Sequence, residues 1–443
     1  MDFNELNGGN LAANHLCVLV HGLWGNPNHL NQMAAAIRAT HSKDQLYLLY
    51  TKSNSGNFTY DGIETCGERV CREIEEELEK IRTAGGNIIK ISIVGYSLGG
   101  LFARYAVGLL YANGILDQVE PVNFTTFATP HLGVRTPLRG WHSEAWNVLG
   151  AKTLSESGRQ LFLIDSYRDT ERPLLEILTD PDSIFITGLK KFKRRTLYSN
   201  IINDRTVPHF TSMITKTDPY VNLAKLKPNF VKGYDDVILD PHHPYTSASL
   251  AVEKGSLLNS VTSGGLEYVK NGPFLVAFAF LLPLGITAFL LNSVVQTVRS
   301  SRRIHLHEMG QAGIQIEKYR MPIWIKELRG TVEDAYENIN NSQKQEYLTP
   351  VDDDSESRAT EAGQKHILAL ERRQSQADLP TLALAPSQFT MIKALDTVGF
   401  RKYPVWIHRV RHSHAAIITR IDKETYREGE IVFKHWLNEE FII

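Results

Sequence analysis

The feature that most constrains the fold is a G-x-S-x-G motif at residues 95–99, which lies between a predicted buried strand and a predicted helix. Gly95 and Gly99 permit a tight turn from strand to helix, because a Cβ at either position would crowd the central residue. Such a turn raises the hydroxyl of Ser97 out of the sheet, above a helix N-terminus. The helix is predicted independently by apolar side chains at helical spacing: Leu98, Leu101, Phe102, Tyr105, Ala106 and Leu109. We interpret Ser97 as a nucleophile. An ordinary glycine-rich loop is the weaker alternative.

A second glycine turn follows the first predicted strand, the apolar run at residues 16–20. His21 and Gly22 begin this turn, and a glycine lets the main chain approach a substrate carbonyl closely. We therefore expect the main-chain N–H groups of Leu23 and Leu98 to form an oxyanion hole. For His21 we prefer a structural role, in which the ring bonds to loop carbonyls, over a catalytic one.

Predicted strands and helices alternate along the first 200 residues. This order is typical of an α/β fold with a mostly parallel sheet, right-handed crossovers and helices on both faces. The predicted strands are residues 16–20, 46–50, 88–94, 122–128 and 196–202. The longest predicted helix covers residues 61–82, and we interpret its glutamates as a solvated face. They are Glu73, Glu75, Glu76, Glu77 and Glu79.

Composition narrows the class of protein. A chain of 443 residues is long enough for one large domain with insertions or for two domains. The formal net charge of -1 gives no reason to expect a nucleic-acid partner. The three cysteines, Cys17, Cys66 and Cys71, indicate free thiols in a reducing compartment. The first fifteen residues lack the basic start and apolar core of a signal peptide. We expect an intracellular globular protein with neither a metal nor a cofactor.

Three motifs occur in a fixed order: H-G-L-W-G at 21–25, G-Y-S-L-G-G at 95–100 and T-P-H-L-G at 129–133. Together with residues 194–200, 203–208 and 412–418, they resemble the lipase-like serine esterase family of the α/β-hydrolase superfamily. Within that family the chain is most similar to the fungal phospholipases of lipid droplets, which share a hydrophobic insertion at this place. The resemblance covers about residues 14–300 and 390–443. It implies an α/β-hydrolase fold.

The resemblance also implies a catalytic acid and a base, in the chain order Ser, acid, His. Asp204 comes directly after the predicted strand at 196–202, so we expect it to orient the base. The alternative is a turn aspartate that only caps its loop. His414 precedes the apolar run at 415–418 and is the expected base, and His412 is the alternative base. Weaker candidates for the acid are Asp165, Asp169, Asp235 and Asp236.

Two segments are predicted insertions. Residues 134–195 have a helical pattern, and in hydrolases of this fold such a segment forms a cap over the active site. Residues 271–298 carry no charge, and a bilayer-spanning helix needs about 20 apolar residues. However, Pro283 and Gly285 lie in the middle, which suits a bend that enters and leaves one leaflet. Whether this segment spans or re-enters is left open.

The predicted organisation is a hydrolase domain that is interrupted and then completed. Residues 1–255 form its first part, and residues 256–310 form a hydrophobic anchor for a membrane or lipid droplet. Residues 330–385 are polar and poor in aromatic side chains, which predicts a disordered linker. Residues 390–443 return to the hydrolase domain with its last strand, His414 and a terminal helix.

The resemblance and the apolar run together imply a serine hydrolase that cleaves the carboxylic esters of glycerophospholipids. We expect it to act at the surface of lipid droplets or of the endoplasmic reticulum membrane, with the catalytic domain facing the cytosol. The expected partners are the phospholipid substrate and a lipid surface bound through residues 271–298. The alternatives are a hydrolase of neutral lipids or short-chain esters, and a non-catalytic scaffold on a lipid surface. The sequence specifies neither head group, sn-position, acyl-chain length nor oligomeric state.

Overall fold

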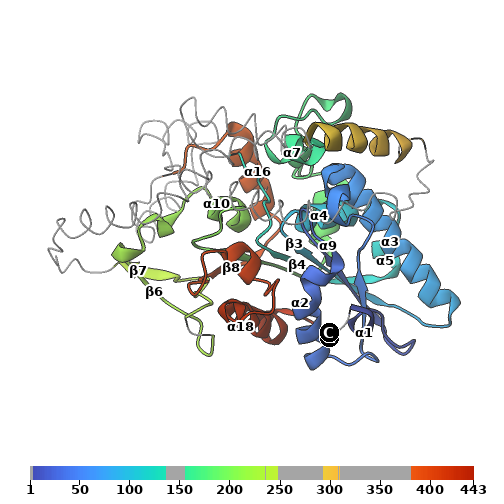
Figure 1. The fold of residues 1–443 in the computed structure, drawn as a ribbon, viewed down its shortest axis with the longest axis horizontal. Coiled ribbons are helices and arrows are strands. Elements are labelled where there is room, and N and C mark those ends of the chain that lie inside the picture. The colour runs from blue at the N-terminus through green and yellow to red at the C-terminus, as the bar shows by residue number, and fades with distance from the viewer. Residues whose placement is uncertain (1–2, 136–154, 235, 248–292, 308, 310–380) are drawn as a thin grey trace, which may run out of the picture.

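The computed structural model describes most of the chain (Figure 1). The described residues are 3–135, 155–234, 236–247, 293–307, 309 and 381–443. The predicted linker at 330–385 lies outside them up to residue 380, and the apolar run at 271–298 lies outside them up to residue 292. Among the residues that the structure describes, no helix is both long and apolar enough to cross a membrane.

A six-stranded sheet, parallel at every pairing, forms the centre of the described structure. Its strand order is β2-β1-β3-β4-β5-β8, so the first strand in the sequence lies inside the sheet. The strands are β1 (His15–Val20), β2 (Leu46–Tyr50), β3 (Lys90–Tyr96), β4 (Glu120–Phe127), β5 (Arg194–Asn200) and β8 (Arg401–Val405). The predicted α/β class with a mostly parallel sheet is confirmed. A separate antiparallel pair consists of β6 (Leu226–Pro228) and β7 (Tyr245–Ser247).

Alternation along the strands produces two hydrophobic layers, because successive side chains point to opposite faces. On β1, Leu16 and Val18 belong to one core cluster, whereas Cys17 and Leu19 belong to the other. The first layer includes α3 (Ile63–Thr83), α4 (Leu98–Ala112) and α9 (Ile184–Lys191). The second includes α2 (Asn31–Thr40) and α18 (Glu428–His435). Figure 1 shows α4 and α9 on one side of the strands and α2 and α18 on the other.

The last part of the chain completes the same sheet. β8 pairs in parallel with β5, with Tyr403 opposite Tyr198. Beyond α18, the indole N–H of Trp436 donates to Thr125 Oγ1 on β4 at 3.2 Å. The N–H of Ile442 donates to Asn123 Oδ1 on the same strand at 3.0 Å. Residues that are more than 300 apart in the sequence therefore pack as one unit.

The end of the predicted cap at 134–195 belongs to the helical layer. α9 packs beside α4, where a Cβ at Gly108 would collide with the ring of Phe185. Because α9 leads directly into β5, it is the crossover helix between β4 and β5. The preceding helices are α7 (Ser155–Leu161) and α8 (Leu174–Ile177). Residues 136–154 of the predicted cap lie outside the described residues.

Short helices connect the main elements. In the first half they are α1 (Phe3–Leu6), η1 (Pro27–Leu30), η2 (Gly56–Tyr60), α5 (Ile115–Gln118) and η3 (Arg168–Thr170). In the second half they are α10 (His209–Met213), η4 (Pro219–Lys225), α16 (Pro386–Asp396), α17 (Ser413–Ala416), η7 (Glu424–Tyr426) and the π-helical turn η8 (Trp436–Glu440). Residues 293–307 are also helical.

Candidate active site

Ser97 occupies the turn between β3 and α4 in a strained backbone conformation. Its φ of 54° and ψ of -133° lie in a region that residues with a side chain rarely adopt. The flanking glycines make this turn possible, because strand and helix are in contact around it. A Cβ at Gly95 would collide with Gly100, and one at Gly99 would collide with the carbonyl of His21. The sequence motif therefore forms the strand–turn–helix elbow that its glycines predicted.

His414 lies between Ser97 and Asp204 and contacts both. Its Nε2 is 2.9 Å from Ser97 Oγ, and its Nδ1 is 3.0 Å from Asp204 Oδ2. A neutral imidazole that donates its Nδ1–H to the carboxylate leaves Nε2 free to accept the serine proton. The structure thus brings together all three side chains that we proposed as a catalytic triad. They come from the turn after β3, the loop after β5 and α17.

The Asp204 carboxylate is fixed by its own loop. Its Oδ1 accepts the N–H groups of Thr206 at 3.1 Å and Val207 at 2.8 Å, which closes a turn around the carboxylate. Its Oδ2 accepts an amide N–H from Asn200 at 2.8 Å in addition to the contact with His414. The carboxylate therefore orients the imidazole from a position that three further groups hold.

Two positioning contacts were not predicted from the sequence. The hydroxyl of Tyr96 donates to the main-chain carbonyl of His414 at 3.0 Å, and the two rings lie 5.1 Å apart. The hydroxyl of Ser413 donates to the carbonyl of Ile202 at 2.9 Å, which joins the base loop to the acid loop. Tyr96 occupies a variable position of the elbow motif, and nothing in the motif itself marks it as a partner of the base.

The two proposed oxyanion-hole donors belong to the residues that follow Ser97 and Gly22 in the chain. Leu98 is the first residue of α4, and the first N–H groups of a helix have no acceptor within that helix. Leu23 follows Gly22, whose main chain lies against Ser97. A Cβ at Gly22 would be 2.6 Å from Ser97 Cβ and 3.1 Å from Ser97 Oγ. The glycine is thus required for the loop at 21–25 to approach Ser97 this closely.

The loop at 21–25 is braced by η2. The N–H of Trp24 donates to Thr59 Oγ1 at 3.0 Å, and the N–H of Gly56 donates to the carbonyl of Gly25 at 2.8 Å. The rings of Trp24 and Tyr60 also lie 6.2 Å apart. Because η2 holds this loop from two directions, its position affects the expected oxyanion hole.

The third motif, residues 129–133, packs against the elbow from the end of β4. A Cβ at Gly100 would collide with the side chain of Thr129. Arg104 of α4 is fully buried and donates to the carbonyl of His131 at 3.1 Å. Burial lowers the pKa of this guanidinium to about 9. The three motifs of the sequence are therefore neighbours in space.

The other candidate residues lie in different surroundings. His21 is buried and its Nδ1 is 3.1 Å from the carbonyl of Gly22, as expected for a structural histidine. His412 is half-buried and directly precedes α17, and it is His414 that contacts Ser97. Asp165 accepts the N–H of Leu174 at 2.8 Å, at the start of α8, and burial raises its pKa to about 6.

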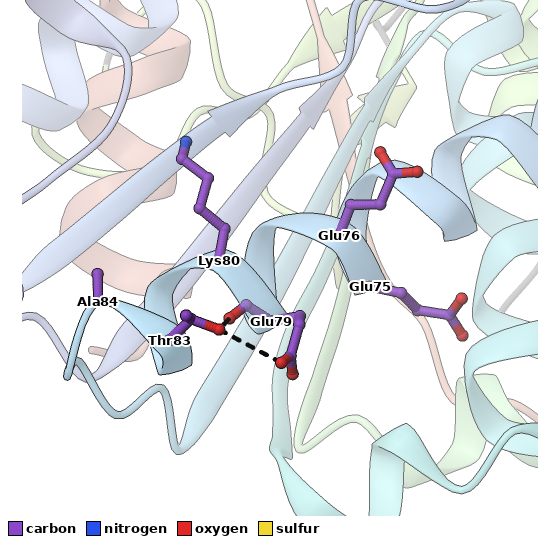
Figure 2. Close-up of a pocket in the computed structure, with 6 residues that line it drawn as sticks. All are labelled: Glu75, Glu76, Glu79, Lys80, Thr83 and Ala84. Carbon is purple, nitrogen blue, oxygen red and sulfur yellow. Dashed lines mark hydrogen bonds between the residues drawn. The ribbon is translucent and has the colours of Figure 1, made fainter. Parts of the chain in front are cut away.

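A shallow hollow on the outer face of α3 lies apart from these residues (Figure 2). It is lined by Glu75, Glu76, Glu79, Lys80, Thr83 and Ala84. Figure 2 shows that one helix supplies all of these side chains, as expected for the solvated face predicted there. Glu73 departs from that prediction, because it is 9% exposed and accepts the N–H groups of Lys52 at 2.9 Å and Ser53 at 2.8 Å.

Comparison with known proteins gives matches over up to about half of the chain. A family model described as Putative serine esterase (DUF676) matches residues 10–217. Putative lipase ROG1 of Saccharomyces cerevisiae is 32% identical over 232 residues, which are 49% of this chain and 32% of that protein. Putative lipase C4A8.10 of Schizosaccharomyces pombe is 31% identical over 205 residues, 45% of this chain and 26% of that protein. The matched parts thus span about a third or less of these relatives.

Among solved structures, a lipase-esterase related protein from Clostridium acetobutylicum is similar over 44% of this chain and 77% of that chain, with 15% identity and a TM-score of 0.25. The family match at 10–217 contains the elbow serine, the loop at 21–25 and Asp204. Over these residues the chain is similar to the Putative serine esterase (DUF676) family.

Proposed function

We propose that the protein is a serine hydrolase that cleaves the carboxylic ester bonds of glycerophospholipids at a lipid surface. The observation that carries this proposal is the pair of hydrogen bonds at His414. They join a strained, glycine-flanked serine to a carboxylate held by its own loop. A serine hydroxyl is a weak nucleophile until a neighbouring base removes its proton, and this arrangement supplies the base and its orienting acid.

The proposed reaction begins when Ser97 Oγ attacks the ester carbonyl and His414 Nε2 accepts the hydroxyl proton. The carbonyl oxygen becomes an oxyanion, which the N–H groups of Leu23 and Leu98 stabilise. When the tetrahedral intermediate collapses, the bond to the alcohol breaks and His414 gives its proton to the leaving oxygen. Water, deprotonated by His414, then attacks the acyl-serine, and the bond to Ser97 Oγ breaks as His414 returns the proton to Oγ and a fatty acid leaves. Asp204 stabilises the imidazolium in both halves.

The phospholipid substrate is supported by the resemblance to lipid-droplet phospholipases and by the uncharged run at 271–298. The relatives' names include the word lipase, which agrees with a lipid ester. We propose that this run attaches the protein to lipid droplets or to the endoplasmic reticulum membrane, with the catalytic residues on the cytosolic side. Hydrolysis of neutral lipids or of short-chain esters is the second candidate, because the same triad chemistry applies to them.

The test compares the full chain with Ser97→Ala on three substrates: phosphatidylcholine vesicles, a triacylglycerol emulsion and a soluble short-chain ester. Ser42→Ala, an exposed serine near the end of α2, is the matched control. We expect wild type and Ser42→Ala to release fatty acid from phosphatidylcholine fastest, and Ser97→Ala to lose on the order of 10⁶ in turnover on every substrate. Preference for the emulsion would reject the phospholipid assignment. Equal turnover by Ser97→Ala would reject Ser97 as the nucleophile, and no turnover by wild type on any of the three substrates would reject the hydrolase itself.

A further inference from the structure

The helix at residues 293–307 packs with its polar side inward. Its buried positions are Ser293, Gln296, Ser300 and Arg303. Its valines face outward: Val294 is 63% exposed, Val295 46% and Val298 65%. A surface helix of a soluble domain normally buries its apolar stripe and exposes its polar one. This helix does the reverse, so its outward face exposes apolar side chains that a surface other than water would cover more favourably.

A buried cluster of charges fixes this orientation. Asp61, which follows η2, has a side chain that is 0% exposed, and it accepts hydrogen bonds from the helix and from α3. Arg303 Nε donates to it at 2.9 Å and Ser300 Oγ at 2.7 Å, and Arg69 Nη2 donates at 2.8 Å. The guanidinium of Arg303 also lies 4.9 Å from the centre of the Phe58 ring. Separating buried charges is costly, so the helix cannot easily turn its polar side outward.

A second contact, one turn further along, holds the helix against rotation about the Asp61 cluster. His307 Nε2 lies 2.6 Å from Glu68 Oε2 on α3. Ser300, Arg303 and His307 follow the three- and four-residue spacing that places side chains on one face of a helix. With this face held at two levels, the valines are directed away from the domain. Figure 1 shows the helix, coloured gold, at the outer edge of the molecule on the side of α3.

The outward face combines apolar and basic side chains. Arg299 and Arg302 are exposed together with Val294, Val295 and Val298, and we call these five residues the valine–arginine face. Its valines continue the uncharged run that begins at residue 271 in the sequence. An apolar face flanked by arginines suits the boundary of a phospholipid layer, where acyl chains lie beside phosphates.

The same face is connected to the active site through η2. Arg303 Nη2 donates to the carbonyl of Asn57 at 3.1 Å. Two residues further along η2, Thr59 accepts the N–H of Trp24 in the loop beside Ser97. A surface bound to the valine–arginine face is therefore only one short helical turn removed from the expected oxyanion hole.

We propose that the valine–arginine face docks on a phospholipid surface with anionic head groups and so orients the active site toward that surface. The valines enter the layer at the level of the head groups, and Arg299 and Arg302 pair with lipid phosphates. This inference deepens the proposed function and rests on it for the nature of the substrate. The docking itself does not depend on hydrolysis.

The test measures vesicle binding by full-length chains that all carry Ser97→Ala, so that no turnover occurs. One pair of changes is Val294→Asp with Val298→Asp, and the other is Arg299→Gln with Arg302→Gln. Each arginine near an anionic surface raises the affinity for that surface about fivefold. The arginine pair should therefore weaken binding to phosphatidylserine-containing vesicles roughly 25-fold. Binding to pure phosphatidylcholine vesicles should hardly change. The valine pair should weaken binding to both kinds of vesicle by roughly tenfold or more.

Matched controls come from exposed positions elsewhere. Val221→Asp, where the valine is 60% exposed on η4, and Arg72→Gln, on the surface of α3, should leave vesicle binding unchanged. A direct contact is measured with an environment-sensitive dye on Ser301→Cys, an exposed position of the helix, since the three native cysteines are buried. Vesicles should shift its emission to the blue. The same dye on Thr83→Cys, at the exposed end of α3, should not respond.

Two results would overturn the docking proposal. One is unchanged vesicle binding in both pairs together with no dye response at position 301. The other is a dimer that becomes a monomer in the valine pair, because a second copy of the chain would then cover this face. Failure of the proposed function looks different: wild type would release no fatty acid from phospholipid, whereas the Ser97→Ala chain would still bind vesicles through Val294, Val298 and the two arginines.

Discussion

The serine is held in place by residues that allow the main chain to crowd around it. A strained backbone like that of Ser97 costs about 1–3 kcal/mol, which the surrounding packing has to offset. Gly22, Gly95 and Gly99 allow that packing, because each lies where a Cβ would meet a neighbouring main chain or the serine itself. These glycines are visible in the sequence, which is why the position of the elbow serine could be predicted from the motif.

The acid is tested by a change that preserves its shape. Asp204→Asn should lower kcat by about 10⁴, because an amide can stabilise the wrong tautomer of His414. Fatty-acid release or hydrolysis of a soluble ester gives the measurement, and unchanged thermal unfolding shows that the loop is intact. His412→Ala is the matched control. Its kcat should stay within roughly tenfold of wild type, since the ring that contacts Ser97 is that of His414. An inactive His412→Ala beside an active His414→Ala would reverse the assignment of the base.

At the scale of elements, α18 closes the sheet with a buried histidine. His435 Nδ1 lies 2.8 Å from the hydroxyl of Tyr198, and its ring lies 4.5 Å from that of Tyr403. Burial lowers the pKa of His435 from 6.5 to about 4. Packing of the helix on β5 and β8 therefore favours the neutral form of this imidazole.

This packing predicts a loss of stability in acid. Below pH 6.5 the unfolded chain takes up a proton that folded His435 refuses until about pH 4, so the free energy of unfolding falls across that range. At pH 5 the loss from this residue is about 2 kcal/mol. Urea unfolding at pH 7 and pH 5 measures it. His435→Gln keeps a polar partner for Tyr198 but does not titrate. Its free energy of unfolding should therefore fall less between pH 7 and pH 5. An equal loss in both proteins would contradict the role given to His435.

Elements differ in how far the sequence predicts them. β2 was predicted at its observed bounds, because a short apolar run with flanking polar residues has few alternatives. β5 begins and ends two residues earlier than predicted, since Arg194 pairs with Asn123 in the ladder although its side chain is polar. The orientation of the helix at 293–307 could not be predicted, because an amphipathic pattern favours an inward apolar face and this helix buries its polar face. The ion pair of Arg303 with Asp61 and the contact of His307 with Glu68 hold that polar face inward.

At the scale of the whole molecule, distant parts of the chain meet at one edge of the sheet. Ser97 and Asp204 follow the ends of β3 and β5, and His414 follows β8. In a parallel sheet these carboxyl ends lie at the same edge, so the order of the motifs predicted that they would converge. Their fine positioning was not predictable. The contact from Tyr96 to the carbonyl of His414 joins residues 318 apart, and no local pattern encodes such a pair.

The central claim is that Ser97 is a nucleophile activated by His414. The most direct measurement is the rate and site of labelling by a fluorophosphonate, read by intact mass and peptide mapping of the full chain. The phosphonate should be on Ser97 in wild type and absent from Ser97→Ala. In His414→Ala the rate of labelling should fall by at least about 10³. Label on a different residue, or labelling of His414→Ala at the wild-type rate, would contradict the proposed triad.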